Sequence, residues 1–199
     1  MISDTLIQIL QKRGFQVTSL ATKNDARDYI LSQCEGKTVG MGGSVTLTEL
    51  ALYDTLQDIA TPYWHAKCPG ADTMLSANKA QIYLTSANGI AETGEIINID
   101  GHGNRISSTL FTHEKVLYVI GVNKIAPDYQ QAMHRARNIA GPRNAKRLKK
   151  NTPCARSAVD RCFDCNSPER ICRGFLTITH PLTAHGATEI VFVDEPLGY

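Results

Sequence analysis

The sequence contains no apolar run long enough to span a membrane, which takes about 20 residues. Its first twenty residues lack the basic start and the continuous apolar stretch of a secretory signal peptide. Neither sign of charge dominates, since the formal net charge is +2, and this value favours no class of partner. These absences predict a cytoplasmic protein with no membrane contact. In that reducing compartment, clustered cysteines more often bind metal or carry out redox chemistry than form disulfides.

The chain has 199 residues, of which 42% are hydrophobic and 20% charged, and this suits one domain with a substantial core. No repeat, low-complexity tract or linker divides residues 1–199, so we expect a single domain. Helical spacing predicts helices over residues 4–12, 23–34 and 127–141, the last opened by Pro127 and closed by Gly141. Strands are predicted over residues 15–20, 36–42, 80–88, 95–100, 114–123 and 189–194.

A further helix follows residue 44 and turns Leu47, Leu50 and Ala51 inward, whereas residues 62–80 are expected to form a loop and a short helix. Strands and helices therefore alternate along the chain. This alternation predicts an α/β fold with a mainly parallel sheet and helices on both faces.

The stretch "VGMGGSVTLTEL" (residues 39–50) places glycines between a predicted strand and a predicted helix. Free N–H groups and a helix dipole at such a turn favour an anion, and Ser44 and Thr46 add hydroxyl donors. No Gly-Lys-Ser/Thr follows, and Val45 occupies the last glycine position of a G-x-G-x-x-G pattern, so neither standard nucleotide motif is present. Gly42 and Gly43 thus form either an anion site or a tight turn that binds nothing.

Other predicted strand ends carry polar side chains that can reach the same crevice, because parallel strands deliver their carboxyl ends to one edge. A second glycine-rich loop, residues 101–103, exposes His102 and then enters a helix near Arg105. Lys124 follows a third strand as a cation aimed at the crevice or as a solvated loop lysine. The residues expected to complete the site are Asn88, Glu92, His102, Asn104 and Lys124.

Several segments together resemble the LUD-domain family of lactate-utilisation proteins. They are "GMGGSVTLTEL", "SANGIAETGEIINIDGHGNRI", "VIGVNKI", "RNIAGPRNAKRL" and "TPCARSAVDRCFDCNSPERIC". The resemblance implies a fold similar to that of ribose-5-phosphate isomerase, glucosamine-6-phosphate deaminase and the CoA transferases. In ribose-5-phosphate isomerases a similar glycine loop followed by Ser-Thr holds a sugar phosphate.

The resemblance also bears on catalysis. Methylthioribose-phosphate isomerase and its relatives carry a catalytic aspartate where this chain has Asn88, and an amide cannot take up a proton as a carboxylate does. Glu92, Glu95 and His102 remain as replacement bases, and no counterpart of the nucleophilic glutamate of CoA transferases can be assigned.

Two functions follow from the resemblance. Some family members belong to a cytoplasmic iron–sulfur complex that oxidises L-lactate to pyruvate, which implies an accessory component with other lactate-utilisation subunits as partners. The alternative is a stand-alone enzyme acting on a small phosphorylated or CoA-linked substrate. No flavin or nicotinamide motif is present. Either function requires a small anionic ligand in the crevice.

Four cysteines form the pattern C-x7-C-x2-C-x6-C within an irregular segment, residues 150–173. Cys154, Cys162, Cys165 and Cys172 can hold zinc or an iron–sulfur cluster, although the spacing matches neither standard ferredoxin pattern. Reduced structural thiols and disulfides are the alternatives.

Residues 134–150 contain seven Lys or Arg and no acidic residue. This stretch is either a solvated face or a positive field that steers a phosphate, a CoA-type ligand or an acidic partner. Nucleic acid is not expected, because no recognition motif accompanies it.

Overall fold

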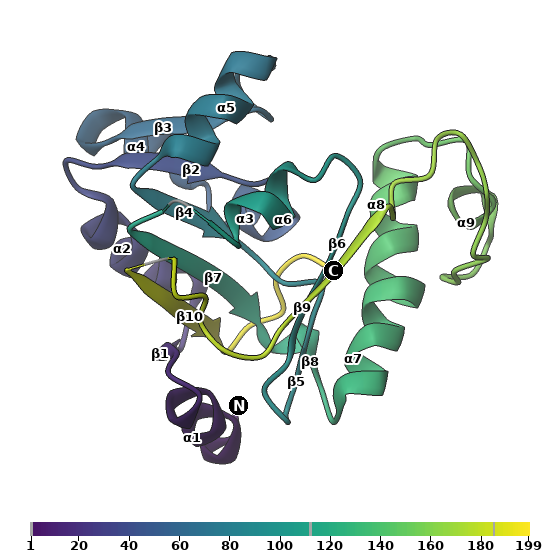
Figure 1. The fold of residues 1–199 in the computed structure, drawn as a ribbon, viewed down its shortest axis with the longest axis horizontal. Helices are drawn as coiled ribbons and strands as arrows, with labels where there is room; N and C mark the ends of the chain where they lie inside the picture. The colour runs from purple at the N-terminus through teal and green to yellow at the C-terminus, as the bar shows by residue number, and fades with distance from the viewer. Residues whose placement is uncertain (1, 112, 185) are drawn as a thin grey trace.

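The computed structural model describes residues 2–111, 113–184 and 186–199. Its main sheet consists of β1 (Gln16–Leu20), β2 (Thr38–Met41), β3 (Thr61–Trp64), β4 (Ile82–Thr85), β7 (Lys115–Gly121) and β10 (Ala187–Val193). These six strands are all parallel to their neighbours, in the order β1-β10-β7-β4-β2-β3 (Figure 1). The predicted α/β class with a mainly parallel sheet is therefore confirmed.

A second, four-stranded sheet was not predicted. It comprises β5 (Gly89–Ala91), β6 (Ile96–Asp100), β8 (Ile125–Ala126) and β9 (Gly174–Ile178) in the order β8-β5-β6-β9. β6 is antiparallel to both β5 and β9, whereas β5 and β8 are parallel. The chain enters this sheet directly after β4 and again after β7, so both sheets meet at the carboxyl ends of the main strands (Figure 1).

Helices flank both sheets. They are α1 (Asp4–Lys12), α2 (Lys23–Cys34), α3 (Val45–Glu49), α4 (Leu52–Ile59), α5 (Ala71–Lys79), α6 (Asn104–Ser108), the 3₁₀ turn η1 (Val122–Lys124), α7 (Tyr129–Arg135), the π-turn η2 (Ala136–Ala140), α8 (Gly141–Arg147) and α9 (Pro153–Arg156). Side-chain caps explain why α1 and α2 begin where the sequence predicted. The Ser3 hydroxyl accepts the Leu6 N–H at 3.2 Å, and Thr22 forms a capping box with Asp25.

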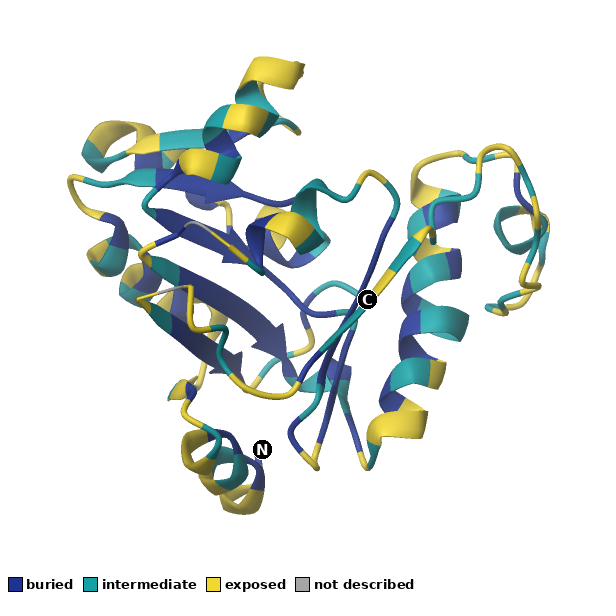
Figure 2. Cartoon of the chain, in the orientation of Figure 1, coloured by how far each residue is buried: buried dark blue, intermediate teal, exposed yellow. Residues whose placement is uncertain are grey.

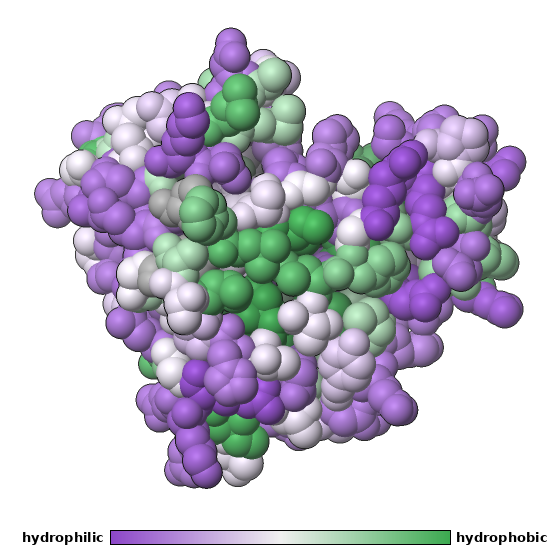
Figure 3. Space-filling view, viewed as in Figure 1, coloured by the Kyte–Doolittle hydropathy of each residue, from purple (hydrophilic) through white to green (hydrophobic). Residues whose placement is uncertain are grey.

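The core has two main layers, one on each face of the parallel sheet. Side chains from α2, α3 and α4 pack against one face, and α1 and the second sheet pack against the other. The central strands β2, β4, β5, β6, β7 and β10 are accordingly mostly buried, as Figure 2 shows in dark blue, whereas the edge strands β1, β3 and β9 are partly exposed. Figure 3 shows an apolar area in the middle of one face, surrounded by hydrophilic residues. Within the described residues, no helix is both long and apolar enough to cross a membrane.

In the structure, the helix predicted over residues 127–141 begins and ends at other residues than expected. It begins after Asp128, whose carboxylate caps it, and continues through Gly141 to Arg147. Gly141 has a helical φ of −59°, and a glycine typically ends a helix in the left-handed conformation. Pro142 has no N–H to donate, and the wider π-turn immediately before it accommodates this missing bond.

Two further expectations were wrong. Ala51 is exposed and left-handed, with φ of 49°, so it separates α3 from α4 instead of facing the core with Leu47 and Leu50. The predicted loop at residues 62–80 contains β3, whose Pro62 is tolerated because this strand lies at the edge of the sheet. The short helix expected there is α5.

Candidate functional site

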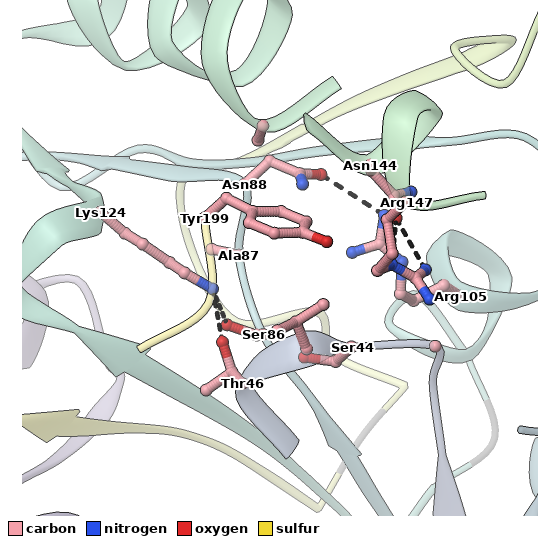
Figure 4. A pocket seen from close by; sticks show the side chains of 13 residues that line it. Ser44, Thr46, Ser86, Ala87, Asn88, Arg105, Lys124, Asn144, Arg147 and Tyr199 are labelled. Atoms are coloured by element: carbon pink, nitrogen blue, oxygen red, sulfur yellow. Dashed lines mark hydrogen bonds between the residues drawn. The ribbon is translucent and has the colours of Figure 1, made fainter. Parts of the chain in front are cut away.

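A pocket lies where the carboxyl ends of β2, β4 and β7 meet the second sheet and α8. Gly43 and Ser44 follow β2, Ser86 and Asn88 follow β4, and Lys124 follows β7. Figure 4 shows these side chains converging with Asn144 and Arg147 from α8 and with Tyr199. The pocket opens into a larger cavity of about 340 Å³ that shares the walls Gly43, Asn88, Arg105, Asn144 and Arg147. We call the two together the crevice.

Lys124 is the buried cation of the crevice, with only 3% of its surface exposed. Its Nζ donates to Thr46 Oγ1 at 2.7 Å and to Ser86 Oγ at 2.8 Å, and Ser86 Oγ in turn donates to the Val119 carbonyl at 2.6 Å. Burial, with the nearby guanidinium groups of Arg135 and Arg105, lowers the pKa of Lys124 to about 7. The two hydroxyls orient the amine, but neither neutralises its charge.

Arg105 forms the opposite wall. Its guanidinium donates to Asn98 Oδ1 at 3.1 Å, to Asn88 Oδ1 at 3.4 Å and to the Ile99 carbonyl. The Asn88 amide oxygen also accepts the Ile99 N–H at 2.8 Å, so Asn88 joins the two sheets and positions Arg105. Within the described part of the chain, none of Lys124, Arg105 and Arg147 is ion-paired with a carboxylate.

Two histidines lie in the larger cavity. His102 and Asn104 line it as predicted, together with His65 and Asp100. Burial and the neighbouring His102 lower the pKa of His65, while Asp100 opposes this shift. The Asp100 carboxylate accepts the N–H groups of Gly101 at 2.8 Å, of Arg105 at 2.9 Å and of Ile106 at 3.2 Å, and so holds the loop that carries His102.

The glycine loop that follows β2 differs from the predicted anion site made of backbone N–H groups. The Gly42 N–H already donates to the Leu84 carbonyl at 3.1 Å, and Gly42 is absent from the walls of both pockets. A Cβ there would lie 2.8 Å from the Tyr83 hydroxyl, so glycine is needed for packing. The Ser44 hydroxyl accepts the Leu47 N–H at 3.4 Å as the cap of the five-residue helix α3. The positive charge of the crevice therefore comes from side chains, and Gly43 contributes a part of the wall that carries no side chain.

Glu92 does not reach the crevice and was wrongly included. It is exposed in the turn between β5 and β6, and β5 leads the chain away from Asn88. The expectation assumed that this segment returned to a parallel strand, but β5 and β6 form an antiparallel pair.

The sequence reasoning missed Ser86, His65, Asn144, Arg147 and Tyr199 as crevice residues. Arg147 lies in the basic stretch, residues 134–150, and its spacing from Asn144 on one helix was the available signal. Other members of that stretch have separate roles. Arg143 and Lys146 pair with Asp160 at 2.7 and 3.0 Å, and the buried Arg135 donates to the Asn123 carbonyl at 2.8 Å.

The four clustered cysteines lie beside the crevice. All of them line one small apolar cavity of about 20 Å³, which we call the thiol cavity, and Cys172 also lines the larger part of the crevice. Burial raises the pKa of the Cys172 thiol, and the adjacent Arg170 opposes this shift. Residues 157–173 form neither helix nor strand, so the irregular segment predicted over residues 150–173 is found there, but the short helix α9 occupies Pro153–Arg156. Cys34 is buried and Cys68 is exposed, both away from this group.

The fold and the crevice define an α/β protein with a cationic pocket at the carboxyl ends of parallel strands. The model of the LUD domain matches residues 4–193, and the chain belongs to the LUD-domain family. A crystal structure of a DUF162 family protein from Deinococcus radiodurans has a similar fold, with a TM-score of 0.56, 10% identity, and coverage of 95% of this chain and 94% of that chain. No curated protein gives a significant match. The family is associated with lactate utilisation.

Proposed function

We propose that the protein binds a small carboxylate in the crevice as an accessory component of lactate utilisation in the cytoplasm, alongside other subunits of that process. The observation that carries the proposal is Lys124, a buried amine held by two hydroxyls and lacking a carboxylate partner among the described residues. A buried cation without a counter-ion costs free energy, and an anionic ligand beside it offsets this cost.

The rest of the crevice suits the same ligand. Arg105 and Arg147 add positive charge on the wall opposite Lys124, which favours an anionic ligand. The amides of Asn88 and Asn144 also line the pocket, and their N–H groups can donate to a hydroxyl or keto oxygen next to the carboxylate. The ligand class that follows is a 2-hydroxy or 2-keto acid.

Calorimetric titration with L-lactate, pyruvate, a sugar phosphate and CoA tests the proposal. We expect the two small acids to bind and the Lys124→Met variant to bind them at least about tenfold more weakly, since one charge-assisted contact contributes about 1.5–3 kcal/mol. Lys79→Met, which changes an exposed lysine on α5, is the matched control and should bind as the parent does. Failure of both acids to bind would overturn the carboxylate assignment.

One observation favours the alternative, a stand-alone enzyme. The larger cavity of about 340 Å³ exceeds what a three-carbon acid needs and has the size of a pocket for a larger metabolite. With a pKa of about 7, Lys124 is also partly neutral near pH 7, as a nucleophile or general base must be. Tighter binding of the sugar phosphate or CoA than of the small acids, with turnover that Lys124→Met abolishes, would favour this enzyme.

A further inference from the structure

The thiol cavity brings together four cysteines from residues 154–172, a segment that is irregular after the short helix α9. Cys154 lies on α9, Cys162 and Cys165 on the irregular loop, and Cys172 just before β9. The cavity is closed by the apolar groups of Ile99, Pro142, Ile171 and Phe175. From this arrangement we propose that Cys154, Cys162, Cys165 and Cys172 ligate an iron–sulfur cluster. The inference is independent of the ligand proposed for the crevice.

The cavity between the four thiols suits a cluster better than a single metal ion. A zinc ion bound by four cysteines holds their sulfur atoms roughly 3.8 Å apart, because each Zn–S bond is about 2.3 Å and the geometry is tetrahedral. Among the described residues, however, no three Cys, His, Asp or Glu side chains are grouped so that they could hold one ion. The four thiols surround a cavity instead. An iron–sulfur cluster contains several metal atoms, and its cysteine ligands lie farther apart around it.

The surroundings of the sulfur atoms suit an anionic cluster. The Asp164 N–H donates to Cys162 Sγ at 3.4 Å, and the Arg137 guanidinium lies 3.9 Å from the same sulfur. Asp164 has a left-handed φ of 43°, which turns its N–H back toward Cys162 within the C-x2-C loop. Hydrogen bonds to sulfur and nearby positive charge are among the features that tune protein-bound iron–sulfur clusters.

The loop is also held in shape by hydrogen bonds from Arg170 to its backbone. Arg170 donates to the carbonyls of Cys165 at 2.6 Å and of Cys172 at 2.8 Å, and to Asp164 Oδ1 at 3.1 Å. Arg170 thereby fixes the backbone at two of the four cysteines. The segment is a preformed framework around the cavity, as a cluster site requires.

The test is anaerobic reconstitution of the full chain with ferrous iron and sulfide, followed by desalting, iron and sulfide analysis, and visible and electron paramagnetic resonance spectra. We expect about two or four iron atoms per chain, matched by sulfide, with a visible absorption that bleaches on reduction by dithionite. Cys162→Ser, Cys165→Ser and Cys172→Ser should each retain less than about one iron per chain. Cys68→Ser, which alters an exposed thiol outside the cavity, should load like the parent.

Circular dichroism and thermal melting of each apo variant separate loss of ligation from loss of fold. Folded variants that no longer load support the proposal. Equal iron in parent and variants would show adventitious binding and would overturn it. One colourless zinc per chain in the anaerobically purified protein, or no metal after both purification and reconstitution, would overturn it as well.

Discussion

The charge state of Lys124 makes a quantitative prediction about stability. In the unfolded chain its pKa is near the ordinary value of 10.5, and in the folded protein burial lowers it to about 7. Between these values the unfolded state binds more protons than the folded state, so the free energy of unfolding rises with pH in this window. Below pH 7 both states are protonated and the full cost of burying the charge is present.

The size of the effect follows from the same two pKa values. From pH 7 to pH 9 this residue alone should increase the free energy of unfolding by about 2 kcal/mol, because one pKa unit corresponds to about 1.4 kcal/mol. Lys124→Met removes the titrating group while keeping a long side chain. The variant should therefore be more stable than the parent at pH 7, and this advantage should shrink by about 2 kcal/mol at pH 9.

Urea denaturation of the parent, Lys124→Met and Lys79→Met at pH 7 and pH 9 measures this difference. Comparing the variants at the same two pH values cancels the contributions of the other titrating groups, which all three proteins share. Glu49, Arg105 and Arg135 also act on the charge of Lys124, and all three residues are the same in the parent and in Lys124→Met. An unchanged stability gap between parent and Lys124→Met would refute the lowered pKa and the reasoning built on it.

Three further predictions concern the surrounding structure. Gly42→Ala should lower the free energy of unfolding in urea melts by about 1–3 kcal/mol, because its Cβ would lie 2.8 Å from a buried tyrosine hydroxyl. Gly43→Ala is the control, and it should be close to neutral because its Cβ would lie 3.4 Å from the nearest atom. Asn88→Asp should leave the melting temperature nearly unchanged but weaken carboxylate binding about tenfold in calorimetry, since it adds a negative charge to the crevice. Glu189→Gln should cost about 3–5 kcal/mol at pH 7, because it breaks a buried ion pair with Lys115 at 2.6 Å. Burial raises the pKa of Glu189, but the hydrogen bonds from Lys115, a threonine and a tyrosine outweigh burial, so the pKa is lowered from its ordinary value of 4.5. The stability that the ion pair contributes should therefore be lost as the pH falls below about 4.5, in acid melts followed by circular dichroism.

Five strands of the parallel sheet were predictable because they are rich in apolar or β-branched residues and alternate with segments of helical spacing, whereas the edge strand β3 lies in a stretch expected to be a loop. The second sheet was not predictable. β8 has two residues and β5 has three, which is too short for a periodic pattern, and β9 follows directly on the cysteine segment. Their pairing depends on contacts between distant parts of the chain, as when β6 pairs with β9. Local sequence carries little information about such pairs.

The crevice was predicted in its location but only partly in its chemistry. Residues that directly follow strands, such as Ser44, Asn88 and Lys124, were identified because parallel strands end at one edge. Arg147 and Tyr199 reach the crevice only through the docking of α8 and of the final residues, which is a tertiary event. The glycines suggested an anion site made of backbone N–H groups, yet the N–H of Gly42 is used within the sheet.

The arrangement also restricts which reactions the crevice can perform. Asn88 has an amide that cannot act as a general base, and its amide oxygen already accepts bonds from Ile99 and Arg105. The nearby Asp100 carboxylate is engaged by three backbone N–H groups and holds the loop that carries His102. Lys124, His65 and His102 are candidate bases among the described residues that line the crevice. Each becomes cationic when it accepts a proton, so a reaction that consumes a proton would tighten the crevice's hold on an anionic product.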